Sequence, residues 1–207
     1  RQAIINDDLN AFTRTPQLMG LAAARKVGDL AYGVLTLNAA MADTVALFHA
    51  DHANLIAPGS GAAPSVTTLG TGRTAMRRQT DPKSVTLNIQ PKYLLVPVTL
   101  EDNSRVLASA IYDPDTANKL QKPNPVKEYN LTVVSDPRLD TYDAAAWYLA
   151  ADQNQCDTVI IGHLDDEPNP VMEQKDGWNV GGIEFKVRKD AVAKAVDYRG
   201  LFKNDGN

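Results

Sequence analysis

Two of the chain's 3 histidines lie close together in the stretch FHADHANL, residues 48–55. His49 and His52 are three residues apart, and Asp51 stands between them. On a helix this spacing places both rings on one face, where they could bind a metal ion or act with the carboxylate in acid–base chemistry. The pattern raises the hypothesis of a metal-dependent hydrolase that uses these three residues.

A structural loop is the interpretation we favour for the same residues. A structural zinc ion needs about four ligands and a catalytic one about three with a water, and the ligands left to complete the set are the distant His163 and Cys156. The HEXXH pattern is absent, and the segment follows residues 44–48 into a loop rather than lying on a helix. We therefore predict no catalytic, cofactor-binding or metal-ligating residue, and keep the hydrolase as an alternative.

Other residues that could do chemistry have weaker patterns. Residues 59–61 (GSG) lack the G-x-S-x-G pattern and a preceding strand, and Cys156 has no local catalytic signature. A glycine pair in LGTGRTAM, residues 69–76, lies near three arginines, Arg73, Arg77 and Arg78. This stretch lacks the P-loop lysine and the strand before it, so we predict a helix with a basic exposed face.

An acidic run and three aromatic residues complete the candidates. Asp165, Asp166 and Glu167 precede a Pro-Asn-Pro stretch, which favours a solvated turn over a cation site. The pair Trp147-Tyr148, and Trp178, could form a ligand platform, but their types favour core or interface packing.

Composition excludes several classes of protein. Hydrophobic residues make up 43% and charged residues 22% of the chain, as in soluble globular proteins, and no apolar run reaches the roughly eighteen residues of a membrane span. The net charge of −4 and the pI of about 5.3 argue against a dedicated nucleic-acid binder, which needs a concentrated basic face. The single cysteine excludes an intrachain disulfide and fits a reducing compartment.

The N-terminal quarter is predicted to be helical. Asn6, Asp7 and Asp8 offer one start signal, and Thr15 followed by Pro16 offers a second. We expect a short helix and then a long one over about residues 16–37. The apolar residues of the long helix recur at three-to-four spacing, at Met19, Ala23, Val27, Leu30, Val34 and Leu37.

The middle of the chain alternates loops and short elements. The predicted order is a loop over 38–64, a helix over 65–79, a buried strand over 92–97, a helix over 99–111 and a polar, proline-rich excursion over 113–127. Ser65 is the expected N-cap of the first helix. Thr99 and Asp102 have the spacing of a capping box for the second.

After Glu128 the pattern changes to short β-rich runs separated by turn residues. The runs are YNLTVVS, AAWYLAA, DTVIIGHL, GIEFKVRKD and AVAKAVDYR. Helices first and strands afterwards indicate an α+β fold rather than alternating βαβ units. From the residues alone we predict a soluble α+β domain that is not an enzyme.

Six segments in order resemble the major capsid proteins of tailed bacteriophages. They are residues 1–35, 46–55, 74–79 with 88–101, 133–140, 144–152 and 182–204. The resemblance is to the branch whose capsid region follows a ClpP-like prohead protease in one precursor. It covers nearly the whole chain, and the specificity lies in the order of the segments rather than in any one of them.

This resemblance implies the Hong Kong 97-type capsid fold, an α+β fold with a long spine helix. Residues 1–64 are then the spine helix and following loop of the peripheral domain, residues 65–182 mainly the axial domain, and residues 183–207 return strands to the peripheral domain. Residues 46–55 resemble the loop after the spine helix, for which the family implies no catalytic role.

The resemblance also implies an N-terminal arm and an extended β-hairpin, the E-loop, ahead of the spine helix. We expect both to be absent from this chain, which starts at about the spine helix. Because these parts reach over neighbouring subunits, we expect residues 1–207 by themselves to fold but to stay monomeric or weakly associated. The expected residual contacts are residues 113–127 and 165–169.

The implied function is structural: a major head protein of a tailed phage or prophage that self-assembles into pentamers, hexamers and an icosahedral shell around DNA. Expected partners are further copies, a prohead protease or scaffold during assembly, and packaged DNA by weak non-specific contact, with no membrane and no cofactor. The expected location is the virion, after assembly in the host bacterial cytoplasm. An encapsulin-like nanocompartment shell around an enzyme cargo is the second alternative.

Overall fold

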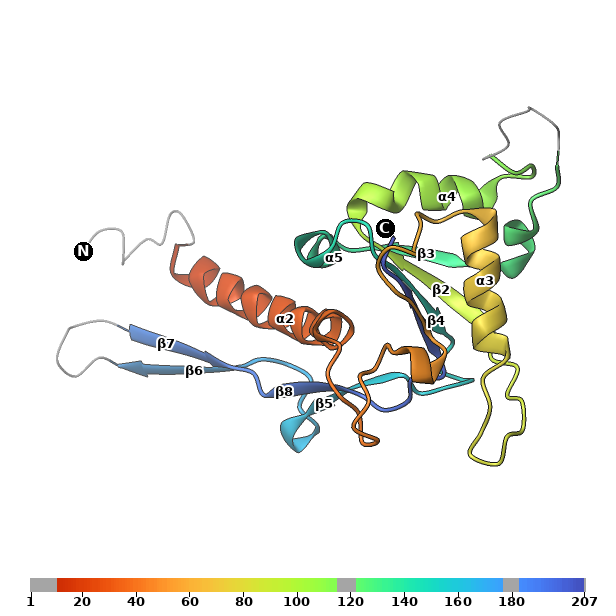
Figure 1. Ribbon diagram of the computed structural model, residues 1–207. Coiled ribbons are helices and arrows are strands. Elements are labelled where there is room, and N and C mark those ends of the chain that lie inside the picture. The colour runs from red at the N-terminus through yellow and green to blue at the C-terminus, as the bar shows by residue number, and fades with distance from the viewer. Residues whose placement is uncertain (1–10, 115–121, 177–182, 207) are drawn as a thin grey trace. The chain divides into compact units, whose positions relative to one another are not determined.

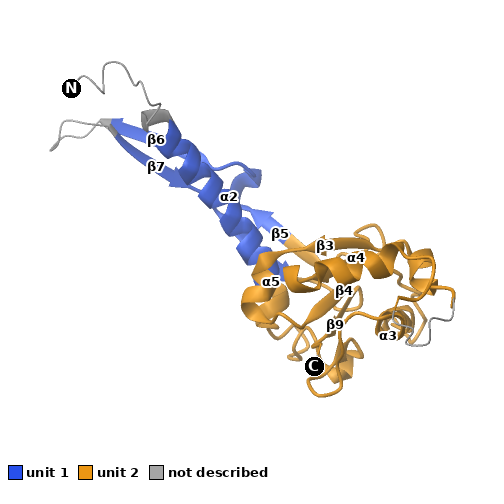
Figure 2. Cartoon of the chain, turned by 90° about the horizontal axis from the view of Figure 1, so that it is seen from above, with its two compact units in different colours: residues 1–33, 161–194 blue, residues 34–160, 195–207 orange. Residues whose placement is uncertain are grey.

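The computed structural model describes residues 11–114, 122–176 and 183–206. The chain forms two compact units, coloured separately in Figure 2. Unit 1 comprises residues 1–33 and 161–194, and unit 2 comprises residues 34–160 and 195–207. The chain passes from one unit to the other within three elements, α2 (Ala11–Leu37), β5 (Val159–His163) and β8 (Ala191–Ala195).

A five-stranded mixed sheet forms the centre of unit 2 (Figure 1). Its strands lie in the order β1 (Leu55–Ile56), β9 (Leu201–Asn204), β4 (Trp147–Ala151), β2 (Pro91–Val96) and β3 (Thr132–Ser135). β4 is antiparallel to both neighbours, so Leu149 lies opposite Phe202 on β9 and Leu94 on β2. β1 is parallel to β9, and β2 is parallel to β3.

The first helix of unit 2, α3 (Val66–Arg77), begins where the sequence predicts. The Ser65 side chain accepts a hydrogen bond from the Thr68 N–H at 3.1 Å, and the Thr68 hydroxyl oxygen accepts one from the Ser65 N–H at 2.9 Å. This reciprocal capping box satisfies two backbone donors at the start of the helix. α3 contacts β9, and its end at Arg77 is two residues earlier than predicted.

The second helix, α4 (Glu101–Ser109), contacts β2 and β3 and connects these parallel strands. The predicted capping box of Thr99 with Asp102 is wrong. The Thr99 hydroxyl donates instead to the carbonyl oxygen of Ala144 at 3.0 Å, and the Asp140 carboxylate accepts the N–H groups of residues 98 and 99. Tertiary partners therefore hold this turn as the short helix η2 (Val98–Leu100).

The hydrophobic core of unit 2 lies between α3, α4 and the sheet. Trp147 and Leu149 of β4 are fully buried, and Leu107 of α4 and Leu69 of α3 pack into the same cluster. The other buried members are Met76, Ile89, Leu94, Val96, Val126, Ala151 and Phe202. The Trp147-Tyr148 pair is thus a core feature rather than a ligand platform, because both side chains are at most 1% exposed.

Unit 1 contains α2 as far as residue 33 and two-stranded ribbons. β6 (Val171–Asp176) and β7 (Ile183–Arg188) pair antiparallel, with an ion pair of 3.1 Å between Glu173 and the opposite Lys186. α2 runs beside this ribbon in both Figure 1 and Figure 2. β5 and β8 form the second ribbon. β6 was not predicted, because VMEQKD shows no apolar alternation.

The long helix ends at Leu37, as predicted, but begins five residues earlier than predicted. α2 begins at Ala11 and continues through Pro16, whose ring already has a helical φ and removes one backbone donor. Of the predicted apolar stripe, Leu37 is 78% exposed and Met19 is 36% exposed, whereas Leu35, outside the stripe, is buried. The start signal at residues 6–8 and the short helix expected there lie outside the described residues.

Short helices complete the described chain. They are η1 (Ala50–His52), η3 (Pro125–Tyr129), α5 (Pro137–Tyr142) and η4 (Leu164–Asp166). η3 replaces the end of the predicted polar excursion, because Asn124 caps it by accepting the Val126 N–H at 3.0 Å. α5 was not predicted, although it begins with an N-cap Asp136 followed by Pro137 in its first turn.

Candidate functional site

His52 is a buried structural residue. Its ring Nε2 lies 2.8 Å from an Asp43 carboxylate oxygen, its Nδ1 lies 3.1 Å from the Leu47 carbonyl oxygen, and it stacks on Tyr198 with centroids 3.7 Å apart. Both polar partners are acceptors, so each ring nitrogen lies within hydrogen-bond distance of an acceptor. Each nitrogen is thus engaged in holding residues 43–52 together and is not directed toward a ligand.

His49, unlike the buried His52, has a partly exposed side chain and caps a short helix. Its ring Nδ1 caps η1 by accepting the Asp51 N–H at 3.2 Å, and it also lies 3.3 Å from the Asp51 carboxylate. Its backbone N–H donates to the buried Asn54 side chain. Among the described residues, no three His, Cys, Asp or Glu side chains are grouped so that they could hold a metal ion. The structure therefore does not group His49, Asp51 and His52, the residues of the alternative metal-dependent hydrolase, into a metal-binding set.

The Asp43–His52 contact predicts a stability effect that depends on pH. The hydrogen bond from His52, followed by that from the Val45 N–H, holds the pKa of Asp43 below its ordinary value. A lowered carboxyl pKa contributes stability above the pKa of the unfolded chain, and this contribution is lost as the pH falls through the folded value. Asp43→Asn should therefore melt below the wild type near neutral pH, and the difference should shrink below about pH 4.

Thermal unfolding of wild type and Asp43→Asn at a series of pH values measures this effect. Asp51→Asn is the control, because its carboxylate is 74% exposed and should contribute little at any pH. A constant difference between wild type and Asp43→Asn down to about pH 2 would contradict the role of the ionised Asp43 carboxylate.

The two candidate nucleophiles lie in environments that do not activate them. Burial, and then the nearby Asp197 carboxylate, raises the pKa of the Cys156 thiol to about 11, so the reactive thiolate is scarce near neutral pH. Ser60 lies in a turn in which Gly59 has a φ of 79°, and its N–H donates to the Ala57 carbonyl oxygen. Among the hydrogen bonds of the described residues, none joins a histidine to either side chain.

The acidic run forms an exposed turn, as predicted from its composition. Asp165 and Asp166 both have left-handed φ values, 54° and 55°, and belong to η4. Glu167 follows and accepts the Asn169 N–H at 3.0 Å. All three acidic residues are exposed. The remaining aromatic candidate, Trp178, lies outside the described residues.

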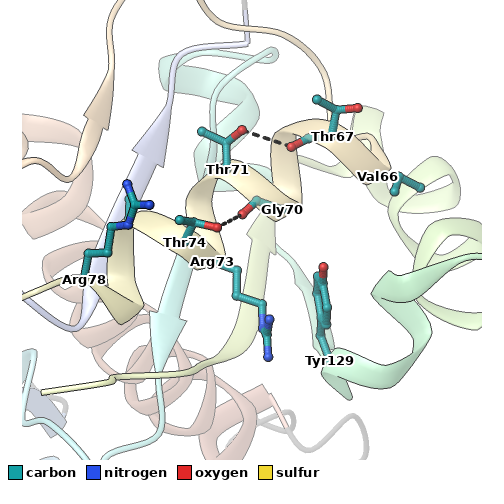
Figure 3. Close-up of a pocket in the computed structure, with 9 residues that line it drawn as sticks. Val66, Thr67, Gly70, Thr71, Arg73, Thr74, Arg78 and Tyr129 are labelled. Atoms are coloured by element: carbon teal, nitrogen blue, oxygen red, sulfur yellow. Dashed lines mark hydrogen bonds between the residues drawn. The ribbon is translucent and has the colours of Figure 1, made fainter. Parts of the chain in front are cut away.

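The arginine-rich stretch forms a pocket on the outer face of α3 (Figure 3). The pocket has a volume of about 550 Å³. Its lining residues are Val66, Thr67, Gly70, Thr71, Arg73, Thr74, Ala75, Arg78 and Tyr129. The Arg73 guanidinium lies over the Tyr129 ring, 4.4 Å from its centroid, whereas Arg77 donates to Asn88 away from the pocket. Tyr129 was missed because no local signal connects it to α3.

Comparison with known proteins identifies the class of this chain. A family model described as phage capsid protein matches residues 1–204. The chain belongs to the phage capsid protein family. This confirms the part of the prediction from the six ordered segments that makes the chain a phage capsid protein. No curated protein matches the chain.

Among solved structures, one similar chain is a phage-related protein from Bordetella bronchiseptica RB50. The two share 14% sequence identity with a TM-score of 0.49, and the match covers 96% of this chain and 68% of the other. None of the helices in the described part of the capsid protein is long and apolar enough to cross a membrane. A capsid protein is a structural component of the virion.

Proposed function

We propose that this chain is a major capsid protein with the Hong Kong 97-type fold, which self-associates into pentamers and hexamers and builds an icosahedral shell around DNA. The match of the phage capsid family model to residues 1–204 carries the proposal. The mixture of a long helix, two ribbons and a mixed sheet is the α+β architecture that the resemblance implies.

We further propose that unit 1 is the peripheral domain and unit 2 the axial domain. Unit 1 contains most of the long helix α2 and the β6–β7 ribbon, and unit 2 contains the five-stranded sheet with α3 and α4. Under this assignment the domain boundaries move from residues 64 and 182 to residues 33, 160 and 194. The return to the axial domain at residue 195 then delivers β9 to the central sheet.

Exposed apolar side chains of unit 1 support association between copies. The most exposed large members on α2, β6 and β8 are Leu18, Leu21, Met172 and Val192, each at least 50% exposed. Two-stranded ribbons and a single helix offer little surface under which to bury these side chains. If a neighbouring copy covers these side chains, the contact between the copies gains about 25 cal/mol for each Å² of apolar surface removed from water.

We also propose partners other than further copies of the chain. A prohead protease or scaffold is proposed to assist assembly in the host cytoplasm, as in the branch of the family that the segments resemble. Packaged DNA is proposed to make only weak, non-specific contact. The net charge of −4 supports this, because an acidic protein does not grip phosphates strongly.

Electron microscopy of the complete gene product, expressed in bacteria and purified by sedimentation, tests the proposal. Closed shells with fivefold and sixfold clusters of subunits are the expected result. Material that stays monomeric or becomes amorphous, under conditions where other members of the family form shells, would count against it. Unit 1 and unit 2 can then be placed in the density to test the domain assignment.

A further inference from the structure

The pocket on α3 carries positive charge that the described chain does not neutralise. Two of its lining residues are arginines, Arg73 and Arg78, and none is acidic. Within the described residues neither arginine forms an ion pair. This concentration of positive charge stands out in a chain whose net charge is −4.

The Arg73 side chain is held in place by Tyr129. Its guanidinium lies 4.4 Å from the centre of the ring, and Figure 3 shows it extended from α3 toward Tyr129. Stacking on an aromatic face leaves the N–H groups at the edge of the guanidinium plane able to donate. A guanidinium held in this way loses little conformational entropy when it binds a planar, two-oxygen acceptor.

Two of the threonine hydroxyl groups in the pocket already donate within the helix. Thr71 donates to the Thr67 carbonyl oxygen at 3.1 Å, and Thr74 donates to the Gly70 carbonyl oxygen at 2.8 Å (Figure 3). With these two protons used inside the helix, the charged donors that the pocket offers to an anion are those of the two arginines.

The absence of a side chain at Gly70 is a second feature of the pocket that bears on its ligand. A glycine inside a helix costs about 1 kcal/mol relative to alanine, yet a Cβ at Gly70 would meet nothing within 4 Å. Gly72, two residues on, is needed by the chain's own packing, because a Cβ there would lie 2.8 Å from Leu149 Cδ1. Gly70 instead leaves an open notch in the pocket floor, over which another chain can approach closely.

We propose that this pocket receives a carboxylate side chain from a second copy of the chain, with Arg73 as the principal donor and Arg78 supporting it. The inference rests on the proposed shell function and names one contact that builds the shell. Charge complementarity favours this occupant, since the chain carries 25 acidic residues against 21 basic ones. Among them, Asp165 and Asp166 form no ion pair within the described residues.

A carboxylate fits the pocket better than a nucleic acid does. One bidentate guanidinium is enough to bind a carboxylate. A DNA-binding surface gains its affinity from about six to ten phosphate contacts along a basic stripe, and the pocket offers two arginines. The second copy is therefore the occupant, and DNA binding is an outcome for the test to exclude.

The test compares shell formation by the complete gene product and its variants. The variant Arg73→Glu with Arg78→Glu should lower the yield of shells about tenfold or more, because it replaces attraction by repulsion. Arg77→Glu is the control: it makes the same type of exchange at one position of α3 outside the pocket and should assemble as the wild type does. Wild-type assembly by the double variant would overturn the inference while leaving the shell function intact.

A neutral variant keeps the test decisive if the double variant fails to fold. Gly70→Gln should raise the melting temperature of the unassembled protein, since it improves helix propensity, and should still reduce shell yield by filling the notch. Normal assembly of Gly70→Gln would overturn the inference. Binding of a short DNA duplex that the double variant loses, with shells unchanged, would assign the pocket to nucleic acid and also overturn it. A wild type without shells would overturn the proposed function and this contact together.

Discussion

Trp147→Ala is expected to lower the free energy of unfolding by about 3–5 kcal/mol. The Trp147 side chain is fully buried on β4 and lies against the Phe202 ring, with centroids 6.2 Å apart. Its Nε1 donates to the Ala62 carbonyl oxygen at 2.9 Å, across 85 residues of sequence. Alanine therefore leaves a cavity and removes the hydrogen bond to that carbonyl. Equilibrium unfolding in denaturant, followed by circular dichroism, measures the loss.

A substitution at the neighbouring Tyr148 is the control for Trp147→Ala, because it should not lower the free energy of unfolding. The Tyr148 side chain is 1% exposed, but within the described residues its hydroxyl has no hydrogen-bond partner, and burial raises the pKa of the phenol. Tyr148→Phe keeps the ring and removes an unpaired buried hydroxyl, so stability should be unchanged or rise by about 1 kcal/mol. A loss as large as that of Trp147→Ala would show that the hydroxyl is bound by water or by another group.

Gly72→Val is expected to destabilise the protein by about 3 kcal/mol, at the upper end of typical overpacking costs. A Cβ at Gly72 would lie 2.8 Å from Leu149 Cδ1 and 2.9 Å from two ring carbons of Phe202. Both neighbours are at most 2% exposed, so neither has free space into which to move. The branched valine side chain must therefore push α3 away from the sheet, which thermal unfolding should report as a lower melting temperature.

Gly70→Ala on the same helix is the control for this prediction. It gains the same type of helix propensity without meeting any atom, so it should stabilise the isolated protein by about 0.5–1 kcal/mol. Opposite signs for the two variants would separate packing from propensity. If both variants stabilised the protein, α3 would not lie against Leu149 and Phe202 as described.

Local signals in the sequence were sufficient for elements whose stabilising partners lie within a few residues. The N-terminus of α3 is the clearest case, since Ser65 and Thr68 satisfy each other's backbone donors three residues apart. The buried strand β2 was predicted for a similar reason, because its run of apolar residues suits a central strand with little help from context. The order of six segments also indicated the phage capsid family that the family model confirms.

Predictions failed where distant residues compete for the same backbone groups. The start of α4 depends on Asp140 and on the carbonyl of Ala144, each about forty residues away, so the spacing of Thr99 and Asp102 was misleading. The strand β9 is only four residues long, and it becomes a central strand because β1 and β4 pair with its two edges. Pairing of this kind is a property of the assembled sheet and not of the short segment.

For the candidate sites, too, the sequence determined some features and the tertiary structure decided others. Sequence alone determined which residue types are present: a histidine pair without a metal-binding pattern, one cysteine, and arginines on a helix next to small residues. Only the tertiary structure decided that the rings of His49 and His52 have separate partners, that the Cys156 thiol is half-buried, and that Tyr129 lies beneath the Arg73 guanidinium. The physical reason is that hydrogen bonding, burial and stacking depend on distances in space, which the folded sheet sets between residues far apart in the chain.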